Sequence, residues 1–175
     1  MAGNEQLNDQ DLARREKLPK YKELGIDAYG QAYEVSHHVN EIRKLCENKS
    51  AEELDAFNLE VSVAGRIKAI RRMGKASFMN VQDKSGNIQV YMGIDVVGEE
   101  KYNLFKMSDI GDIVGVSGRV MLTRMGELTI RATGFTHLVK CLHPLPEKFH
   151  GLTDVEERSR KRYLDLIMND EARKV

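Results

Sequence analysis

Residues 71–91, RRMGKASFMNVQDKSGNIQVY, contain two alternating runs on either side of a turn signal. Asp83 and Gly86 are the first and fourth residues of DKSG, which is typical of a type I turn. If these two residues pair, four further cross-strand pairs follow: Val81 with Ile88, Asn80 with Gln89, Met79 with Val90, and Phe78 with Tyr91. This register completes an apolar inner face without Phe78, and it places two aromatic rings and two amides on the outer face.

The pattern around this hairpin predicts a five-stranded barrel. Apolar residues alternate from Leu59 onward, which indicates a long first strand, and the hairpin supplies strands two and three. A helix is expected from Gly98 to Met107, a fourth strand from Ile113 to Thr123, and a fifth after the turn at Met125 and Gly126. Five strands with a helix between the third and fourth is the order of the OB-fold, a Greek-key barrel that binds oligonucleotides.

Two details of this barrel are specific predictions. Gly65 and Gly118 lie inside strands one and four, where a short barrel needs its strands to bend. Alternation in strand five sorts its side chains into an inward set, Leu128, Ile130 and Ala132, and an outward set, Glu127, Thr129 and Arg131.

Residues 1–57 are predicted to form a helical extension. A helix capped by Asp11 is expected to run to Leu24, and Pro19 within it either kinks the helix or splits it in two. A second helix is expected to start at a Ser36 cap, and Ser50 with Glu53 forms a capping box that opens a third.

The barrel domain is predicted over residues 58–142, followed by a stiff linker over 143–155 that contains HPLP. A helix near Asp154 carries the basic run Arg158–Arg162, which contacts a further domain, faces solvent or touches nucleic acid. Residues 156–175 are expected to be the start of a domain that continues beyond this sequence, so the chain is interpreted as a fragment.

Charge is distributed unevenly along the 175 residues, although the formal net charge is zero. Residues 58–142 carry 12 basic and 8 acidic side chains, and residues 61–82 carry five basic side chains and no acidic one. A local basic stripe steers an anionic ligand even when the whole chain is neutral.

Other features limit the class of protein. Cys46 and Cys141 form no CxxC pair, which indicates reduced thiols and a cytoplasmic location. No apolar run approaches the length of a membrane-spanning helix. The five histidines show no zinc-ligand spacing, so no metal site is predicted. No set of catalytic residues is predicted either.

The outer face of the hairpin has the chemistry of a single-stranded nucleic-acid site. Aromatic rings such as Phe78 and Tyr91 can stack on bases, and Asn80 and Gln89 can hydrogen-bond base edges. The cations that lead into this face are Arg71, Arg72 and Lys75. The alternative is that Phe78 packs under a loop or under the N-terminal helices and that the amides are ordinary solvated strand residues.

The run VAGRIKAIRRMGKASFMNVQDKSGNIQVY resembles the barrel of the class II aminoacyl-tRNA synthetases for aspartate, asparagine and lysine. The segments ARREKL, LGIDAYG, EELDAFNLEVSVAGRI, TRMGELTI and LHPLPEKFHGLTDVEERSRKRYLDLI resemble bacterial lysyl-tRNA synthetases in particular, over about residues 11–175.

This resemblance implies an anticodon-binding barrel that recognises the uridine-rich anticodon of lysine tRNA. It implies that Phe78 stacks on the central uridine, that Gln89 hydrogen-bonds this base, and that Glu127 reads an adjacent base. It also implies a contact from Arg71 or from Arg72, since the pair could slide by one position. Bracing of the tRNA stem by Arg14, Arg15 and Lys17 is a further hypothesis.

The family attaches lysine to its tRNA with ATP and Mg²⁺ in a catalytic domain through which it dimerises. The resemblance implies that this domain begins near Arg158, so the later motifs that hold ATP are absent from these 175 residues. We therefore expect no cofactor in this chain and no aminoacyl-tRNA synthesis by it alone, which ATP–pyrophosphate exchange would test.

Two other functions compete with anticodon recognition. A general single-strand binder would more often carry extra aromatic and basic residues in place of Gln89 and Glu127. A protein-interaction module would use Phe78 and Tyr91 as an apolar patch, and its binding would lack the steep salt dependence of phosphate contacts.

Overall fold

The computed structural model describes residues 8–144 together with residues 163 and 167. The chain divides into two compact units, Met1–Leu142 and His143–Val175. The first unit contains every named helix and strand of the described part. The expected helix near Asp154 and the basic run Arg158–Arg162 lie outside the described residues, and the predicted domain boundaries stay predictions.

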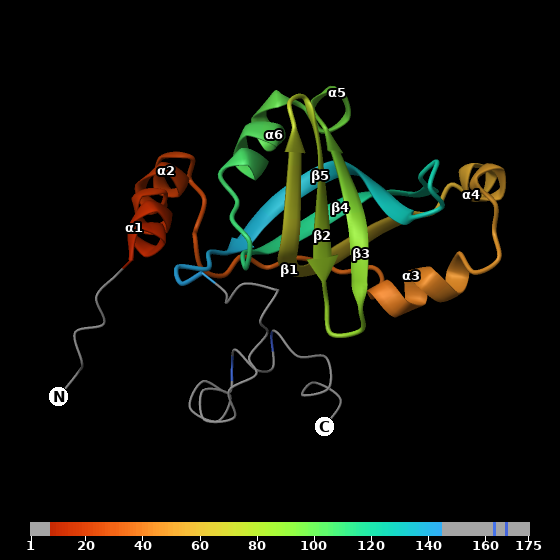
Figure 1. The fold of residues 1–175 in the computed structure, drawn as a ribbon, viewed down its shortest axis with the longest axis horizontal. Helices are drawn as coiled ribbons and strands as arrows, with labels where there is room; N and C mark the ends of the chain where they lie inside the picture. Colours follow the sequence, from red (N-terminus) through yellow and green to blue (C-terminus); the bar gives the residue numbers. More distant parts are fainter. Residues whose placement is uncertain (1–7, 145–162, 164–166, 168–175) are drawn as a thin grey trace. The chain divides into compact units, whose positions relative to one another are not determined.

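Five strands form a closed barrel in the order β1-β2-β3-β5-β4 (Figure 1). Their bounds are β1 Glu60–Met73, β2 Ala76–Gln82, β3 Asn87–Gly93, β4 Ile113–Leu122 and β5 Leu128–Val139. Strands β3 and β5 pair in parallel, whereas the other neighbours are antiparallel. The expected OB-fold order is confirmed.

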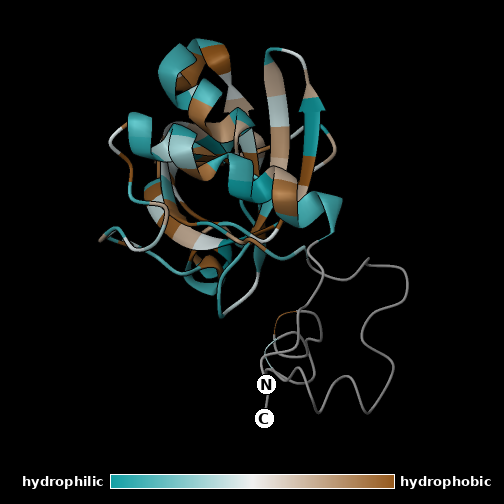
Figure 2. Ribbon diagram, turned by 90° about the vertical axis from the view of Figure 1, so that its left-hand side faces the viewer, coloured by the Kyte–Doolittle hydropathy of each residue, from teal (hydrophilic) through white to brown (hydrophobic). Residues whose placement is uncertain are grey.

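Six helices surround the barrel in the described residues: α1 Asp9–Glu16, α2 Leu18–Glu23, α3 Val39–Leu45, α4 Ala51–Phe57, α5 Ile94–Val97 and α6 Glu99–Lys106. The helix predicted between strands three and four is α6, and the short α5 precedes it. Hydrophobic and hydrophilic residues alternate along the ribbons (Figure 2), which lets one side of each element face the core. Within the described residues, no helix is long and apolar enough to cross a bilayer.

The predicted register of the β2–β3 hairpin is confirmed at all four cross-strand pairs. Met79, Val81, Ile88 and Val90 are buried in the core. The outer face carries the aromatic pair and the amide pair, as expected. The alternation and the turn signal were therefore sufficient to fix which side chains leave the core.

Asp83 holds the turn of this hairpin and docks it on helix α3. Its Oδ1 accepts hydrogen bonds from the backbone N–H of Ser85 at 2.7 Å, from the Ser85 hydroxyl at 2.7 Å and from the Gly86 N–H at 3.0 Å. Its Oδ2 accepts from the N–H of Val39, the first residue of α3, at 2.8 Å. One carboxylate thus satisfies a turn and a helix start together.

Two helix starts differ from their sequence predictions. The first helix is split at Lys17, with Pro19 in the first turn of α2, and it is capped by Asn8 instead of Asp11. Asp11 is the reciprocal member of that capping box, three residues further on. The second helix begins at Val39 and not after Ser36, whose hydroxyl instead accepts from the Ser62 N–H of β1 at 2.8 Å. The Ser50 capping box is confirmed.

The two mid-strand glycines have different roles. The pairing of β4 with β5 shifts register between Ser117 and Gly118, and a Cβ at Gly118 would lie 2.1 Å from the carbonyl oxygen of Arg131. Gly118 is therefore at a bend, as predicted. The irregularity of β1 lies between Ile67 and Ala69 and not at Gly65. Gly65 instead allows close approach, since a Cβ there would lie 2.5 Å from the Gln82 carbonyl oxygen.

A buried ionic cluster joins α1 and the segment after β5 to the barrel. Lys140 has a side chain that is 0% exposed, and its ammonium donates to both Asp112 oxygens, at 3.0 and 2.8 Å, and to Asp109. Lys17 donates to Asp109 from the outer side at 2.8 Å. Arg14 of α1 donates to two carbonyl oxygens, those of Ile110 and Cys141. The cations proposed to brace a tRNA stem thus include two that hold α1 in place.

We expect Asp83→Ala to lower the free energy of unfolding by about 2–4 kcal/mol, because it removes a charged acceptor of four hydrogen bonds. Urea denaturation measures this loss. Lys84→Ala, an exposed change in the same turn, is the control and should stay within about 0.5 kcal/mol of wild type.

The same loss should depend on pH. Burial alone would raise the pKa of Asp83, but hydrogen bonds from Ser85, Val39 and Gly86 outweigh burial and lower this pKa below 3.8. A carboxylate with a depressed folded pKa adds stability that is present above the unfolded value and is lost as pH falls through the folded value. Wild type and Asp83→Ala should therefore converge in stability below pH 3.8. A constant difference at all pH values would contradict this assignment.

Lys140→Met should lower the free energy of unfolding by about 3–5 kcal/mol, because it leaves the buried Asp112 without its cation and leaves the partly exposed Asp109 with Lys17 alone. Lys17→Met is the matched control, since its side chain is 27% exposed, and should cost about 1 kcal/mol or less. Thermal or urea unfolding compares the two variants. Equal decreases in the free energy of unfolding would contradict the prediction that the buried Lys140 contributes more than the partly exposed Lys17.

Candidate nucleic-acid interface

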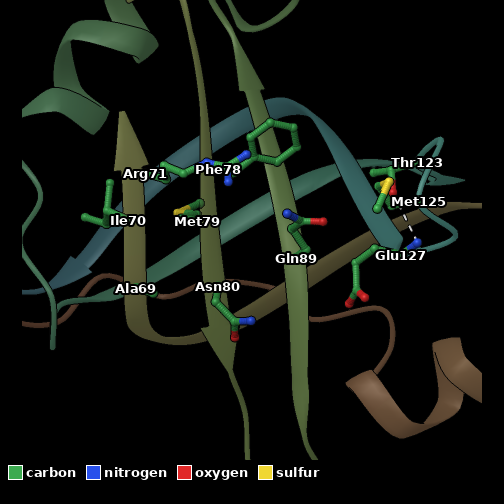
Figure 3. A pocket seen from close by; sticks show the side chains of 10 residues that line it. All are labelled: Ala69, Ile70, Arg71, Phe78, Met79, Asn80, Gln89, Thr123, Met125 and Glu127. Atoms are coloured by element: carbon green, nitrogen blue, oxygen red, sulfur yellow. Dashed lines mark hydrogen bonds between the residues drawn. The ribbon is translucent and has the colours of Figure 1, made fainter. Parts of the chain in front are cut away.

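A pocket of about 510 Å³ opens on the outer face of the barrel. Strands β1, β2 and β3 form its floor, and the β4–β5 turn forms one wall (Figure 3). Ten residues line it: Ala69, Ile70, Arg71, Phe78, Met79, Asn80, Gln89, Thr123, Met125 and Glu127. The pocket therefore joins the hairpin to a turn that lies more than 30 residues further along the chain.

Five of the eight predicted site residues line this pocket, namely Arg71, Phe78, Asn80, Gln89 and Glu127. The other three, Arg72, Lys75 and Tyr91, do not line it. Tyr91 lies directly beside Phe78, and Lys75 is exposed in the turn between β1 and β2. Most of the site residues predicted from the sequence therefore line one pocket, while the function of each residue stays a prediction.

Phe78 is held by contacts with Tyr91 and Arg71. The edge of Tyr91 meets the Phe78 ring at a centroid distance of 5.3 Å and an interplanar angle of 62°. The Arg71 guanidinium carbon lies 5.4 Å from the same centroid. The edge contact from Tyr91 orients the ring, and the guanidinium over the ring would also attract an anionic ligand. Phe78 is partly exposed and borders the pocket.

Arg71 and Arg72 point to different sides of β1. Arg71 pairs with Phe78 across the strands and lines the pocket. Arg72 pairs with the buried Ser77, and its guanidinium donates to the carbonyl oxygens of Lys106 at 3.3 Å and Ser108 at 2.9 Å. Arg72 thereby ties β1 to the end of α6. Arg71 is the member of the pair whose side chain is at the pocket.

The two amides at the pocket present hydrogen-bond donors. The Oε1 of Gln89 accepts from the Thr129 hydroxyl at 3.0 Å. The Oδ1 of Asn80 is buried, and no residue in the described part of the chain hydrogen-bonds it. Because the Gln89 oxygen is engaged by Thr129 and the Asn80 oxygen is buried, the amide nitrogens and the Arg71 guanidinium remain as donors.

Glu127 supplies a hydrogen-bond acceptor at the wall formed by the β4–β5 turn. Its side chain is exposed and lines the pocket, and an ionised carboxylate only accepts hydrogen bonds. Its position is fixed by the turn, where its N–H donates to the Thr123 hydroxyl at 3.1 Å and its carbonyl oxygen accepts from the Thr123 N–H at 3.0 Å. Such a site can hydrogen-bond a group that carries both carbonyl oxygens and N–H donors.

Besides Ala69, Ile70 and the core residue Met79, three residues in or beside the pocket were given no role in it from the sequence. Met125 is 94% exposed at the tip of the β4–β5 turn, and Thr123 opens that turn. The third, Thr129, was predicted to face outward but is 0% exposed beside Gln89. The signal for Met125 was an apolar residue inside a turn, whereas the burial of Thr129 depends on the closure of β3 onto β5.

Nothing in the described residues resembles a metal centre, since no group of three or more His, Cys, Asp or Glu side chains converges there. Cys46 is buried, and burial raises its pKa, which disfavours the nucleophilic thiolate. The polar and aromatic groups that line the pocket are one phenylalanine ring, two amides, one guanidinium, one hydroxyl and one carboxylate.

Comparison with known proteins agrees with this composition. The tRNA_anti-codon family model, described as an OB-fold nucleic acid binding domain, matches residues 61–138. The chain is 51% identical to a lysine–tRNA ligase of Bacillus cereus (strain AH187) over 170 residues, which is 97% of the chain and 34% of that protein. It is also 51% identical to a lysine–tRNA ligase of Enterococcus faecalis (strain ATCC 700802 / V583) over 168 residues.

The chain thus spans about a third of the length of the curated relatives that it matches. The family model covers the barrel strands that build the pocket, and the relatives extend the similarity across the flanking helices. The barrel thus matches the anticodon-binding OB-fold family, and the chain is similar to lysine–tRNA ligases over 97% of its own length.

Proposed function

We propose that the pocket binds the uridine-rich anticodon loop of lysine tRNA. The observation that carries this proposal is that Phe78, Gln89 and Glu127 line one pocket, although they come from three different strands or turns. A ring, a donor and a carboxylate within one pocket can engage successive bases of a splayed single strand. The lysine–tRNA ligases to which this chain is similar support lysine tRNA as the ligand.

In this proposal the central uridine stacks on Phe78, and the Gln89 amide hydrogen-bonds its edge. Glu127 accepts a hydrogen bond from the N–H of an adjacent base, since its carboxylate is an acceptor only. Arg71 contacts the backbone or a base beside the ring. Tyr91 supports the platform, and Asn80 offers its amide nitrogen next to Gln89.

The whole protein of which this sequence forms part is proposed to attach lysine to its tRNA with ATP and Mg²⁺. This extension follows from relatives named lysine–tRNA ligase, of which the chain spans about a third. A homodimer formed through a catalytic domain and a cytoplasmic location are proposed on the same basis.

Phe78→Ala should weaken binding of an RNA hairpin carrying the lysine anticodon by about 5- to 150-fold, the equivalent of roughly 1–3 kcal/mol of base stacking. Fluorescence anisotropy with a labelled hairpin measures this. Phe57→Ala is the matched control, since Phe57 is an exposed phenylalanine on α4 outside the pocket, and it should leave affinity unchanged.

Three results would contradict the proposal in different ways. Equal binding of a hairpin with its central uridine replaced would leave a single-strand binder without base choice. Binding that does not weaken as salt rises would indicate an apolar protein contact. Binding that is unaffected by Phe78→Ala would place the RNA elsewhere on the chain.

Arg71→Gln should weaken RNA binding and reduce the slope of log K against log salt by about 0.7, the value expected for one lost phosphate contact with a single strand. Arg72→Gln should preserve this slope, because its guanidinium is engaged with the carbonyl oxygens of Lys106 and Ser108. It should instead lower stability to urea. A reversal, with the slope falling for Arg72→Gln, would reassign the contact.

A further inference from the structure

Thr129 lies beside the pocket residue Gln89 on the neighbouring strand. The two residues are partners in the parallel pairing of β3 with β5, and Thr129 is 0% exposed. A buried hydroxyl has no water to bind, so its single hydrogen must go to a protein acceptor. Which acceptor receives this hydrogen decides how the Gln89 amide is turned.

Two oxygens compete for that hydrogen. The Gln89 Oε1 lies 3.0 Å from the Thr129 hydroxyl, and the Glu127 carbonyl oxygen lies 3.1 Å from it. The Glu127 oxygen already accepts from the Thr123 N–H at 3.0 Å. The Gln89 oxygen therefore depends on Thr129 more than the Glu127 oxygen does.

The consequence is a fixed direction for the amide. Figure 3 shows the Gln89 oxygen on the side of β5 and its nitrogen on the side of β2, where Phe78 and Asn80 lie. A primary amide nitrogen is a donor only. The edge that Gln89 offers to the pocket is thus a donor, and a half-turn of the amide would make it an acceptor.

We propose that Thr129 is a positioning residue, whose hydroxyl turns the Gln89 amide so that its nitrogen selects a base with an edge carbonyl over one with an amino group. Uracil presents an O4 acceptor where cytosine presents an N4 donor. The donor of Gln89 fits the first and is opposed by the second. This inference rests on the proposed stacking of a base on Phe78.

The reversed amide makes the opposite prediction. In that state the Gln89 nitrogen would donate to the Thr129 oxygen, the hydroxyl would donate to the Glu127 carbonyl, and an oxygen would face the pocket. Such a pocket would prefer cytidine to uridine. The preference of the wild-type chain between these two bases therefore tests the direction without any substitution.

The experiment measures the affinity of the 175-residue chain for two RNA hairpins that differ only in a central uridine or cytidine. We expect wild type to prefer uridine by about 2- to 12-fold, the range for one hydrogen bond. Thr129→Val keeps the shape and β-branching but removes the hydroxyl, so the preference should shrink toward unity. Thr129→Ser restores the hydroxyl and should restore the preference.

Thr133→Val is the matched control. It makes the same substitution on β5 at an exposed residue whose hydroxyl lies 3.4 Å from the Ser117 carbonyl oxygen, outside the pocket. It should retain the wild-type preference. Urea denaturation of the four proteins compares their folding.

Two results would overturn the role of Thr129. One is a cytidine preference in wild type, and the other is an unchanged uridine preference in a folded Thr129→Val. An equal loss of affinity for both hairpins in Thr129→Val would indicate a packing role alone and would also overturn it. Failure of the proposed function is distinguishable, because it would appear as wild-type binding that Phe78→Ala does not weaken.

Discussion

The four hydrogen bonds accepted by Asp83 are the constraint on which the binding face depends. They fix a turn of defined length between β2 and β3, and a slip of one residue in the pairing would exchange the inner and outer faces of one of these strands relative to the other. Either Phe78 of β2 or Gln89 of β3 would then enter the core, and Met79 or Val90 would take its place on the outer face. The same carboxylate holds α3 against the hairpin, so the folding of the flanking helices and the register of the site are coupled.

The hairpin alone is only half of the pocket. Glu127 and Thr129 reach it because β5 pairs in parallel with β3, which closes the barrel. Gly118 permits this closure, because a side chain there would collide with the backbone of β5 at Arg131. The carboxylate wall and the amide floor of the site therefore come together only in the closed barrel, and the proposed choice among bases depends on the tertiary fold.

Local rules explain what the sequence could and could not predict. The register from Phe78 to Tyr91 follows from a turn and from alternation within a few residues, both of which are local. The burial of Thr129 and the engagement of Arg72 with the end of α6 depend on pairings distant in sequence, which alternation does not describe. The cap at Asn8 was missed because Asn8 and Asp11 form one reciprocal capping box, in which either residue could be the first.

In the proposed function, the polar groups at the pocket contribute more to specificity among bases than to overall affinity. The chain has no net charge, and Arg71 is the one cation among the residues that line the pocket. A single cation gives a modest electrostatic contribution to the binding of a single strand. Hydrogen-bond donors with a fixed direction contribute to specificity mainly by disfavouring the wrong base. A buried donor that meets another donor stays unsatisfied, which lowers the affinity for that base. A hydroxyl that fixes one amide can thus influence specificity without touching the RNA.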